Sequence, residues 1–366
     1  MHPDSVRVHS FILRVLHKLS ELLSLLTGHP RGRALLPCIV LAHNEGTILP
    51  EFLRHYRDIG VDRFFIVDDR STDHSLEYLS EQPDVTIYAP VEGSTYRRDK
   101  RIWRAEVLDR HCDGAWVVAP DVDEHILYHD IEQGRDLLAV IASLEDEGAE
   151  ALHAVMLDMY DDRPLQDHRF ADGRLIDSFP LFDGPDHYFR VAVSWRTRRK
   201  FPTPACFAFG GMRQRLFEQI AVSRDTRQGR LLHKYCDIGG DFSPEGFALL
   251  KLRWAHLRLR QMLHTNLIYN CSKIPLLKWR EGMRFQGGAH AISQPLRLSQ
   301  QRAALLHFKF SAGADGLRYI AQRGQHASGS RSYHRMIDQT RVMARSPVFE
   351  GTLRYQTSAS LGRFLN

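Results

Sequence analysis

Short apolar runs alternate with helical patterns along the first third of the chain. Continuous apolar runs without polar interruptions are typical of strands that are buried on both faces, as in a parallel sheet. Such runs predict strands over 37–42, 64–67, 85–88 and 116–118. Between them, apolar residues at helical spacing predict helices over about 48–59, 75–80 and 95–112. Strands and helices that alternate at this spacing indicate right-handed βαβ units, so we expect an α/β fold with a mostly parallel sheet flanked by helices.

The hydrophobic pattern differs on either side of this region. Residues 8–26 carry apolar side chains at helical spacing, and Gly28 with Pro30 would end that helix. Such an amphipathic helix has two uses, docking on the protein's own core or lying against a membrane surface. Further along, the pattern predicts a strand over 155–160 and a helix over 247–263.

Composition narrows the class of protein. The chain has 366 residues, of which 43% are hydrophobic and 25% charged, as is ordinary for a soluble globular protein. Its net charge of +5, from 49 basic and 44 acidic residues, favours anionic ligands such as phosphates but is too balanced for a nucleic-acid-binding protein. No apolar stretch is long enough to span a bilayer. Charged residues interrupt the N-terminal apolar pattern, so a secretory signal is not expected either.

The cysteines indicate the compartment. Cys38, Cys112, Cys206, Cys236 and Cys271 are scattered without any Cys-x-x-Cys spacing. This pattern fits free thiols in a reducing compartment better than a disulfide framework or a zinc site. We therefore expect a cytoplasmic protein, with the alternative of peripheral contact at the inner face of the membrane through the N-terminal helix.

Two acids follow the strand predicted at 116–118. In an extended backbone Asp121 and Asp123 would point the same way, and two neighbouring carboxylates need a cation between them. Mg²⁺ or Mn²⁺, with a diphosphate completing its oxygen ligands, suits that position. An isolated Asp-x-Asp is more often a solvated turn, but open α/β sheets bind ligands beyond the carboxyl ends of their strands. No Gly-x-Gly-x-x-Gly follows the first strand, which disfavours an ordinary dinucleotide-binding domain.

Three segments together resemble the successive signatures of family 2-type glycosyltransferases of the GT-A fold, and most closely a bacterial branch related to the DUF23/family 92 enzymes. The segments are His43-Asn44-Glu45, residues 60–73 with Asp68-Asp69, and Asp121-Val122-Asp123-Glu124. Four later segments resemble that family more loosely, at 209–217, 272–279, 288–290 and 305–310.

The resemblance implies a division of the chain. It predicts a GT-A domain over 35–335, made of a nucleotide-binding half (35–130) and an acceptor half (131–335) with an insertion near 221–266. The N-terminal helix (1–34) and a C-terminal tail (336–366) would flank this domain.

Site residues are carried over from the family by motif. Asn44 and Glu45 would lie near the nucleotide, and Asp68 and Asp69 would contact the base or the ribose. Asp121 and Asp123 would hold the divalent ion and the donor, Mn²⁺ or Mg²⁺ being the cofactor. Enzymes of this fold often add a histidine from the C-terminal part as a metal ligand. His290 and His307 are the candidates here, with His307 preferred because His-Phe-Lys resembles the His-Tyr motif of family 92.

Basic residues and a catalytic base complete the predicted site. Lys273, Lys309, Arg213 and the basic cluster at 97–104 could meet phosphates, although a solvated helix face also explains that cluster. An inverting transfer needs a carboxylate base to take the proton of the acceptor. The usual Glu-Asp pair of the family is not evident, and the weak candidates Asp237, Asp241 and Glu245 lie inside the predicted insertion.

The expected function is therefore that of a metal-dependent, inverting glycosyltransferase. By resemblance it would move a sugar from a nucleotide-sugar donor, a UDP-sugar being favoured, to a carbohydrate or glycolipid acceptor in surface polysaccharide or glycoconjugate synthesis. A non-catalytic sugar-nucleotide or carbohydrate binding protein is the alternative, supported by the missing base. A sugar nucleotidyltransferase would need a glycine-rich, basic signature after the first strand, and none is visible. The sequence does not define the donor sugar, the acceptor or the oligomeric state.

Overall fold

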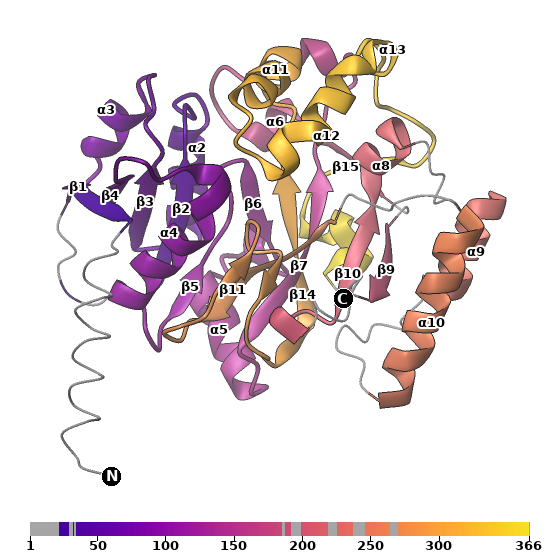
Figure 1. Cartoon of the computed structure of the whole chain (residues 1–366), viewed down its shortest axis with the longest axis horizontal. Helices are drawn as coiled ribbons and strands as arrows, with labels where there is room; N and C mark the ends of the chain where they lie inside the picture. The colour runs from indigo at the N-terminus through magenta and orange to yellow at the C-terminus, as the bar shows by residue number, and fades with distance from the viewer. Residues whose placement is uncertain are drawn as a thin grey trace.

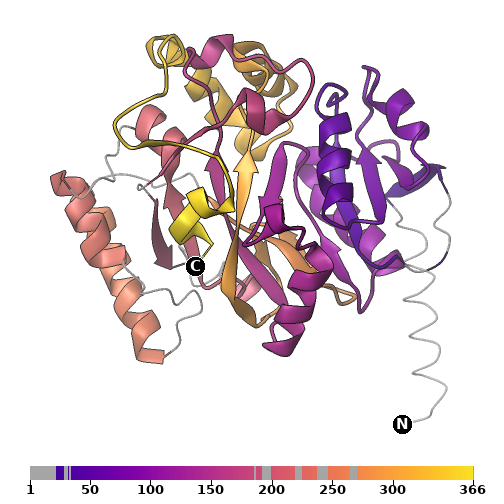
Figure 2. The same ribbon diagram turned by 180° about the vertical axis from the view of Figure 1, so that it is seen from behind.

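A nine-stranded sheet with helices on both faces forms the centre of the molecule (Figure 1; Figure 2). The computed structural model describes residues 22–28, 32, 34–184, 187–191, 199–218, 225–236, 246–263 and 270–365. The strand order is β1-β4-β3-β2-β5-β11-β7-β14-β6. These strands are β1 (Leu23–Thr27), β2 (Pro37–Ala42), β3 (Arg63–Asp68), β4 (Val85–Pro90), β5 (Trp116–Val118), β6 (Glu124–Leu127), β7 (Ala151–Asp158), β11 (Ser272–Lys278) and β14 (Leu298–His307).

Most strands of this sheet run in one direction. Strands β4, β3, β2 and β5 pair in parallel with their neighbours, and so do β7 and β14. Strand β11 is antiparallel to both β5 and β7, so these two groups of strands share one direction. Only β1, β6 and β11 of the sheet run the other way. The expected α/β fold with a mostly parallel sheet flanked by helices is confirmed, including its first four strands.

Alternation along the buried strands builds a core on each face of the sheet. In β2, Cys38 and Val40 join one cluster of buried side chains, whereas Ile39 and Leu41 join another. Successive side chains of a strand point to opposite faces, so each fully apolar run serves both clusters. The first cluster packs under α2, α3 and α5 and the second under α4. These helices are α2 (Leu49–Asp58), α3 (Ser75–Ser80), α4 (Tyr96–His111) and α5 (Leu137–Asp146).

The helix predicted over 8–26 is wrong where the structure describes it. Residues 23–27 form strand β1, which pairs antiparallel with β4, and the earlier residues lie outside the described part of the chain. The physical reason is the edge of the sheet. Strand β4 offers a row of unpaired backbone groups, and an apolar segment beside such an edge gains more from a ladder of hydrogen bonds than from a last helical turn.

The second half of the chain adds small sheets and a group of helices. The helix expected at 247–263 is present as α10. Helices α11 and α12 lie near the carboxyl ends of β7 and β14 (Figure 1). The elements are α6 (Leu175–Ser178), β8 (Leu181–Asp183), β9 (His187–Val191), β10 (Cys206–Gly210), α8 (Gly211–Phe217), α9 (Arg227–Cys236), α10 (Gly246–Leu263), β12 (Phe285–Gln286), β13 (Ala291–Ile292), α11 (Gly313–Arg323), α12 (Ala327–Asp338), α13 (Thr340–Met343) and β15 (Thr352–Arg354), with 3₁₀ turns at Ile131–Gln133, Leu165–Asp167 and Ser358–Phe364.

Both halves contribute strands to the nine-stranded sheet, and the tail packs against its core. Strands β11 and β14 of the second half pair with β5 and β6 of the first half, and β7 lies between β11 and β14. Leu361, Phe364 and Leu365 join the larger core cluster. The division at residue 130 and the boundary of the tail stay predictions.

Two further expectations concern cysteines and membrane spans. The cysteines whose side chains the structure describes are buried thiols, namely Cys38, Cys112, Cys206 and Cys271. Among the helices that the structure describes, none has the length and apolar character needed to cross a bilayer.

Candidate functional site

A cavity of about 470 Å³ opens at the carboxyl ends of β2, β5, β7 and β14. Its walls come from the loops after these strands and from β11, α4, α11 and α12. Six of the residues predicted to bind the donor or the metal line it, namely Asn44, Glu45, Asp121, Asp123, His290 and His307, and so do the predicted basic residues Lys100, Arg213, Lys273 and Lys309. Side chains from positions more than 250 residues apart therefore meet where an open α/β sheet binds its ligands.

Asp123, Glu124 and His307 form a compact cluster at this edge of the sheet. One potential ligand atom from each residue lies within 4.8 Å of the other two. The pairing of β6 with β14 places His307 directly opposite Glu124. The backbone N–H of Phe308 donates to the carbonyl of Asp123 at 2.8 Å, which fixes the turn that carries Asp123 beside His307. Two carboxylates and an imidazole so arranged can hold a divalent cation.

A buried ion pair orients the imidazole of His307. Its Nδ1–H donates to Oδ1 of Asp158 at 2.7 Å, and Arg213 Nε donates to the other oxygen of that carboxylate at 2.8 Å. The Nε2 atom of His307 then faces Asp123 Oδ2 at 3.4 Å. Burial alone would lower the pKa of His307, but the charge of Asp123 and the hydrogen bonds to Asp123 and Asp158 raise it overall. A carboxylate behind a histidine is also the arrangement that fixes a metal-binding imidazole in proteins.

Asp121 borders this cluster, and two cations hold its carboxylate. Arg104 Nη2 lies 2.5 Å from one oxygen, and Lys273 Nζ lies 2.6 Å from the other. Burial opposes the charge of Asp121, but these two cations bring its pKa well below the usual range. Lys273, with 1% of its side chain exposed, also contacts Glu124 at 2.8 Å. Each oxygen of Asp121 thus already has a cationic partner.

The local backbone explains why Asp121 and Asp123 point to different partners. Residues 122 and 123 form a turn between β5 and β6, not a continuation of the strand. The alternation rule that aligns residues two apart holds only for extended backbone, so it fails here. The two acids that share the cluster with His307 are Asp123 and Glu124. Asp121 as a metal ligand stays a prediction.

The loop after β2 brings Asn44 and Glu45 to the cavity. Asn44 has a positive φ of 55°, and its side-chain oxygen accepts from the backbone N–H of Thr72 at 2.7 Å. Its amide nitrogen also donates to the hydroxyl of Tyr319 on α11 at 2.6 Å. Burial, and then the charge of Asp123, raise the pKa of Glu45 to about 8. Through its bonds to Thr72 and Tyr319, Asn44 connects the loops after β2 and β3 to helix α11.

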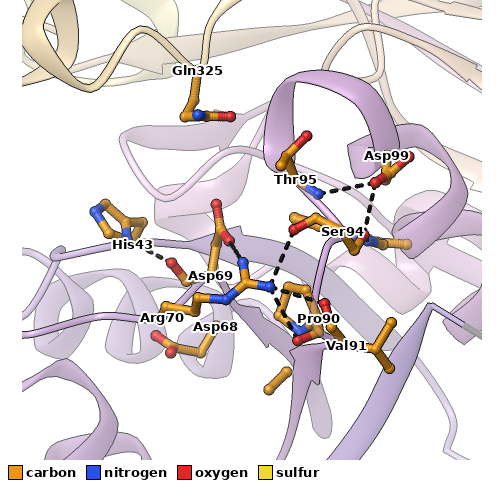
Figure 3. Close-up of polar contacts among 12 residues, drawn as sticks. His43, Asp68, Asp69, Arg70, Pro90, Val91, Ser94, Thr95, Asp99 and Gln325 are labelled. Carbon is orange, nitrogen blue, oxygen red and sulfur yellow. Dashed lines mark hydrogen bonds and ion pairs between the residues drawn. The ribbon is translucent and has the colours of Figure 1, made fainter.

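The two acids after β3 have different surroundings. Asp69 lines a second cavity of about 210 Å³ with His43, Tyr96 and Arg323, and its carboxylate forms ion pairs with Arg70 and Arg323. Figure 3 shows Arg70 reaching across to the carbonyls of the loop after β4. Asp68 lines neither cavity. One of its oxygens accepts from the backbone N–H of Ser71 at 3.0 Å, so it shapes the loop.

The predicted basic cluster at 97–104 divides between solvent and the site. Arg98 is exposed and pairs with the neighbouring Asp99, whereas Arg104 is buried against Asp121. Lys100 lines the cavity, and burial lowers its pKa to about 8. Lys309 also lines it, 3.3 Å from Asp123. The solvated-face interpretation therefore fits only part of the cluster.

Several residues that line the cavity were not predicted from the sequence. Tyr319, Arg323, His326 and Tyr333 line the cavity from α11 and α12. Their position in the sequence could have indicated them, because α11 and α12 follow shortly after the His307-Phe-Lys309 segment. The weak base candidates Asp237, Asp241 and Glu245 lie outside the described residues and stay predictions.

The two candidate histidines should respond differently to removal. His290 Nδ1–H donates to the carbonyl of Ser272 at 2.8 Å, and its pKa falls to about 3 because of burial and the charge of Lys273. His290 is not in the cluster with Asp123. We expect His307→Ala to raise the Mn²⁺ concentration for half-maximal ligand binding about tenfold or more, and His290→Ala to change it less than about threefold. Titrating Mn²⁺ into each variant with a bound nucleotide checks this, and equal mild effects would mean that neither is a ligand.

Comparisons with known proteins give only distant likenesses. No protein-family model matches the chain, and no curated protein matches it. Solved structures that align with part of it include the following two. A mannosyltransferase from Pyrobaculum calidifontis in complex with GDP-Man and Mn²⁺ is 21% identical over 42% of this chain and 43% of that one, with a TM-score of 0.23. A protein from Bacillus anthracis described as a glucose-1-phosphate thymidylyltransferase, in complex with a sucrose, is 10% identical over 36% of this chain and 57% of that one, with a TM-score of 0.24. This chain thus spans roughly half of each structure that it resembles.

Proposed function

We propose that this protein is a glycosyltransferase that moves a sugar from a nucleotide-sugar donor to a carbohydrate acceptor with the help of a divalent cation. The observation that carries the proposal is the cavity at the carboxyl edge of the sheet. It combines the acidic cluster of Asp123, Glu124 and His307 with the ammonium groups of Lys100, Lys273 and Lys309. The sequence resemblance to GT-A glycosyltransferases supplies the class of reaction.

The side chains present fit a divalent cation. We propose Asp123, Glu124 and His307 as its ligands, with Asp158 and Arg213 holding the imidazole in place. Carboxylate oxygens with one imidazole suit Mn²⁺ or Mg²⁺ better than a soft metal. When bound, such a cation stabilises the charge that develops on a departing diphosphate. Asp121 stays a predicted ligand, and its two ion pairs support a second proposed role, that of holding Lys273 and Arg104 at the cavity.

Cations of the protein would share the neutralisation of the diphosphate. Lys309 is held beside Asp123, and the charge of Asp123 helps to keep its pKa well above the usual range despite burial. Lys100 lines the same cavity from α4. Fixed cations aimed at a leaving group act strongly in a site that excludes water. We propose that Asn44, Glu45 and Asp69 lie on the nucleotide side, where Tyr319 and Arg323 of α11 meet the loops after β2 and β3.

Thermal unfolding with a panel of nucleotide sugars tests this proposal. A ligand at about one hundred times its dissociation constant stabilises the native state by about 2.7 kcal/mol. We expect one nucleotide sugar, with UDP-sugars tried first, to raise the unfolding temperature in the presence of Mn²⁺. EDTA should remove this shift. The matching nucleoside monophosphate, which lacks the second phosphate, is the control and should shift the transition less.

Two outcomes would count against the proposal. Absence of a shift with every nucleotide sugar would argue against a soluble nucleotide-sugar donor. A shift that EDTA leaves unchanged would separate nucleotide binding from the cluster of Asp123, Glu124 and His307.

A further inference from the structure

Helix α10 carries a stripe of exposed apolar side chains. Phe247 is 81% exposed, Leu250 62%, Trp254 60% and Leu257 58%. Their spacings of three, four and three residues place them along one side of the helix. Large apolar side chains that gather on one exposed surface mark sites of interaction more often than single ones do.

The stripe is not the side by which α10 is attached to the protein. Leu249, which is 9% exposed, packs with Cys206 of β10, and Ala255 is 6% exposed. The helix also contacts α9 and β9. Both views show α10 at the rim of the molecule on the side away from β1 (Figure 1; Figure 2). The buried side thus supplies the attachment and leaves the stripe facing outward.

All the charged residues of the two helices at this rim are basic. Helices α9 and α10 contain no aspartate or glutamate over their 10 and 18 residues. The chain as a whole is nearly balanced, with 49 basic and 44 acidic residues. Lys251 and Arg258 are exposed on α10 itself. The acids nearest to these helices in the sequence are Asp225, two residues before α9, and Asp237, Asp241 and Glu245 between the two helices. The basic residues are Arg227, Arg230, Lys234, Lys251, Arg253, Arg258 and Arg260.

We propose that α10 binds the surface of a bilayer that contains anionic lipids. Phe247, Leu250, Trp254 and Leu257 would enter the boundary between headgroups and acyl chains, and the exposed Lys251 and Arg258 of α10 would lie against the headgroups. The exposed side of α10 combines an apolar stripe with the basic Lys251 and Arg258 and no acid, and a membrane interface accommodates both kinds of side chain. Tryptophan prefers that depth of the bilayer, and the basic side chains complement anionic headgroups. This inference does not depend on the proposed function.

Co-sedimentation of the full chain with lipid vesicles tests this surface. Wild-type protein should bind vesicles of phosphatidylcholine with phosphatidylglycerol more tightly than vesicles of phosphatidylcholine alone. The double variant Trp254→Glu with Leu257→Glu should partition about tenfold or more weakly, because two large apolar side chains no longer enter the bilayer. Ile102→Glu is the matched control, since Ile102 is 45% exposed on α4 among basic neighbours and should bind like wild type.

A second variant separates charge from folding. Lys251→Gln with Arg258→Gln keeps the apolar stripe and should weaken binding to the anionic vesicles about tenfold, while leaving thermal unfolding unchanged. Wild-type partitioning of the double glutamate variant, or no binding by the wild type, would overturn the inference. Sedimentation velocity tests the alternative that a second copy of this chain binds to the stripe. If the glutamate variant turned a dimer into a monomer without changing vesicle binding, α10 would be a self-association surface and the inference would be wrong.

Discussion

Transfer activity is expected to fall about 10²–10³-fold when Asp123 is replaced by asparagine. The substitution keeps the shape of the side chain and removes the charge that faces His307 Nε2 at 3.4 Å and Lys309 at 3.3 Å. A cation held by this cluster would lose a ligand, and the ammonium group of Lys309 would lose its fixed partner. The initial rate of nucleoside diphosphate release measures the effect.

The control for Asp123→Asn is Asp146→Asn. Asp146 is exposed at the end of α5 and does not line the cavity. This control should keep the wild-type rate. The thermal unfolding of both variants shows whether a lost rate reflects chemistry or folding. A wild-type rate in Asp123→Asn would remove Asp123 from the set of proposed ligands.

The largest loss of stability is expected for Lys273→Met. The ammonium group of Lys273 contacts Asp121 and Glu124, and only 1% of its side chain is exposed. Methionine would fill much of the volume but leave both carboxylates without this cation. Removing one partner of a buried ion pair costs about 3–5 kcal/mol, because the remaining charge stays buried. Urea denaturation should show a decrease of that size in the free energy of unfolding.

Lys278→Met is the matched control in the same strand. Lys278 pairs with Glu145 at 3.1 Å, but about half of each side chain is exposed, 45% and 50%. Surface ion pairs contribute about 0–1 kcal/mol, so we expect a change within that range. Similar small losses in both variants would mean that water or a neighbouring cation already neutralises Asp121 and Glu124.

Local sequence patterns correctly predicted four of the parallel strands of the sheet. The strands at 37–42, 64–67, 85–88 and 116–118 are apolar except for Thr86, and burial on both faces is what makes such runs recognisable. The same patterns missed β1, because an apolar segment at helical spacing does not reveal that the edge of β4 lies beside it. Pairing with an edge is a tertiary effect, and it overrides local propensity.

The candidate site divides in the same way. Asp123 follows a recognisable strand, so its position at the sheet edge was predictable, and His307 could be preferred over His290 by its neighbours in sequence. The ion pair of Asp121 with Lys273 could not be predicted from the sequence, since it joins residues 152 positions apart. Arg323 reaches Asp69 across 254 positions. The tertiary fold brings such partners together, and a local helical or alternating pattern does not indicate them.

Release of nucleoside diphosphate from nucleotide sugars, with and without Mn²⁺, tests the central claim most directly. The wild-type protein should release it from one nucleotide sugar at a rate that rises with a carbohydrate acceptor. EDTA should stop this release, and Asp123→Asn should lack it. That result would establish transfer at the cluster of Asp123, Glu124 and His307. Binding of a nucleotide sugar without any release, with every acceptor tried, would contradict the claim and make the protein a binding protein on this fold.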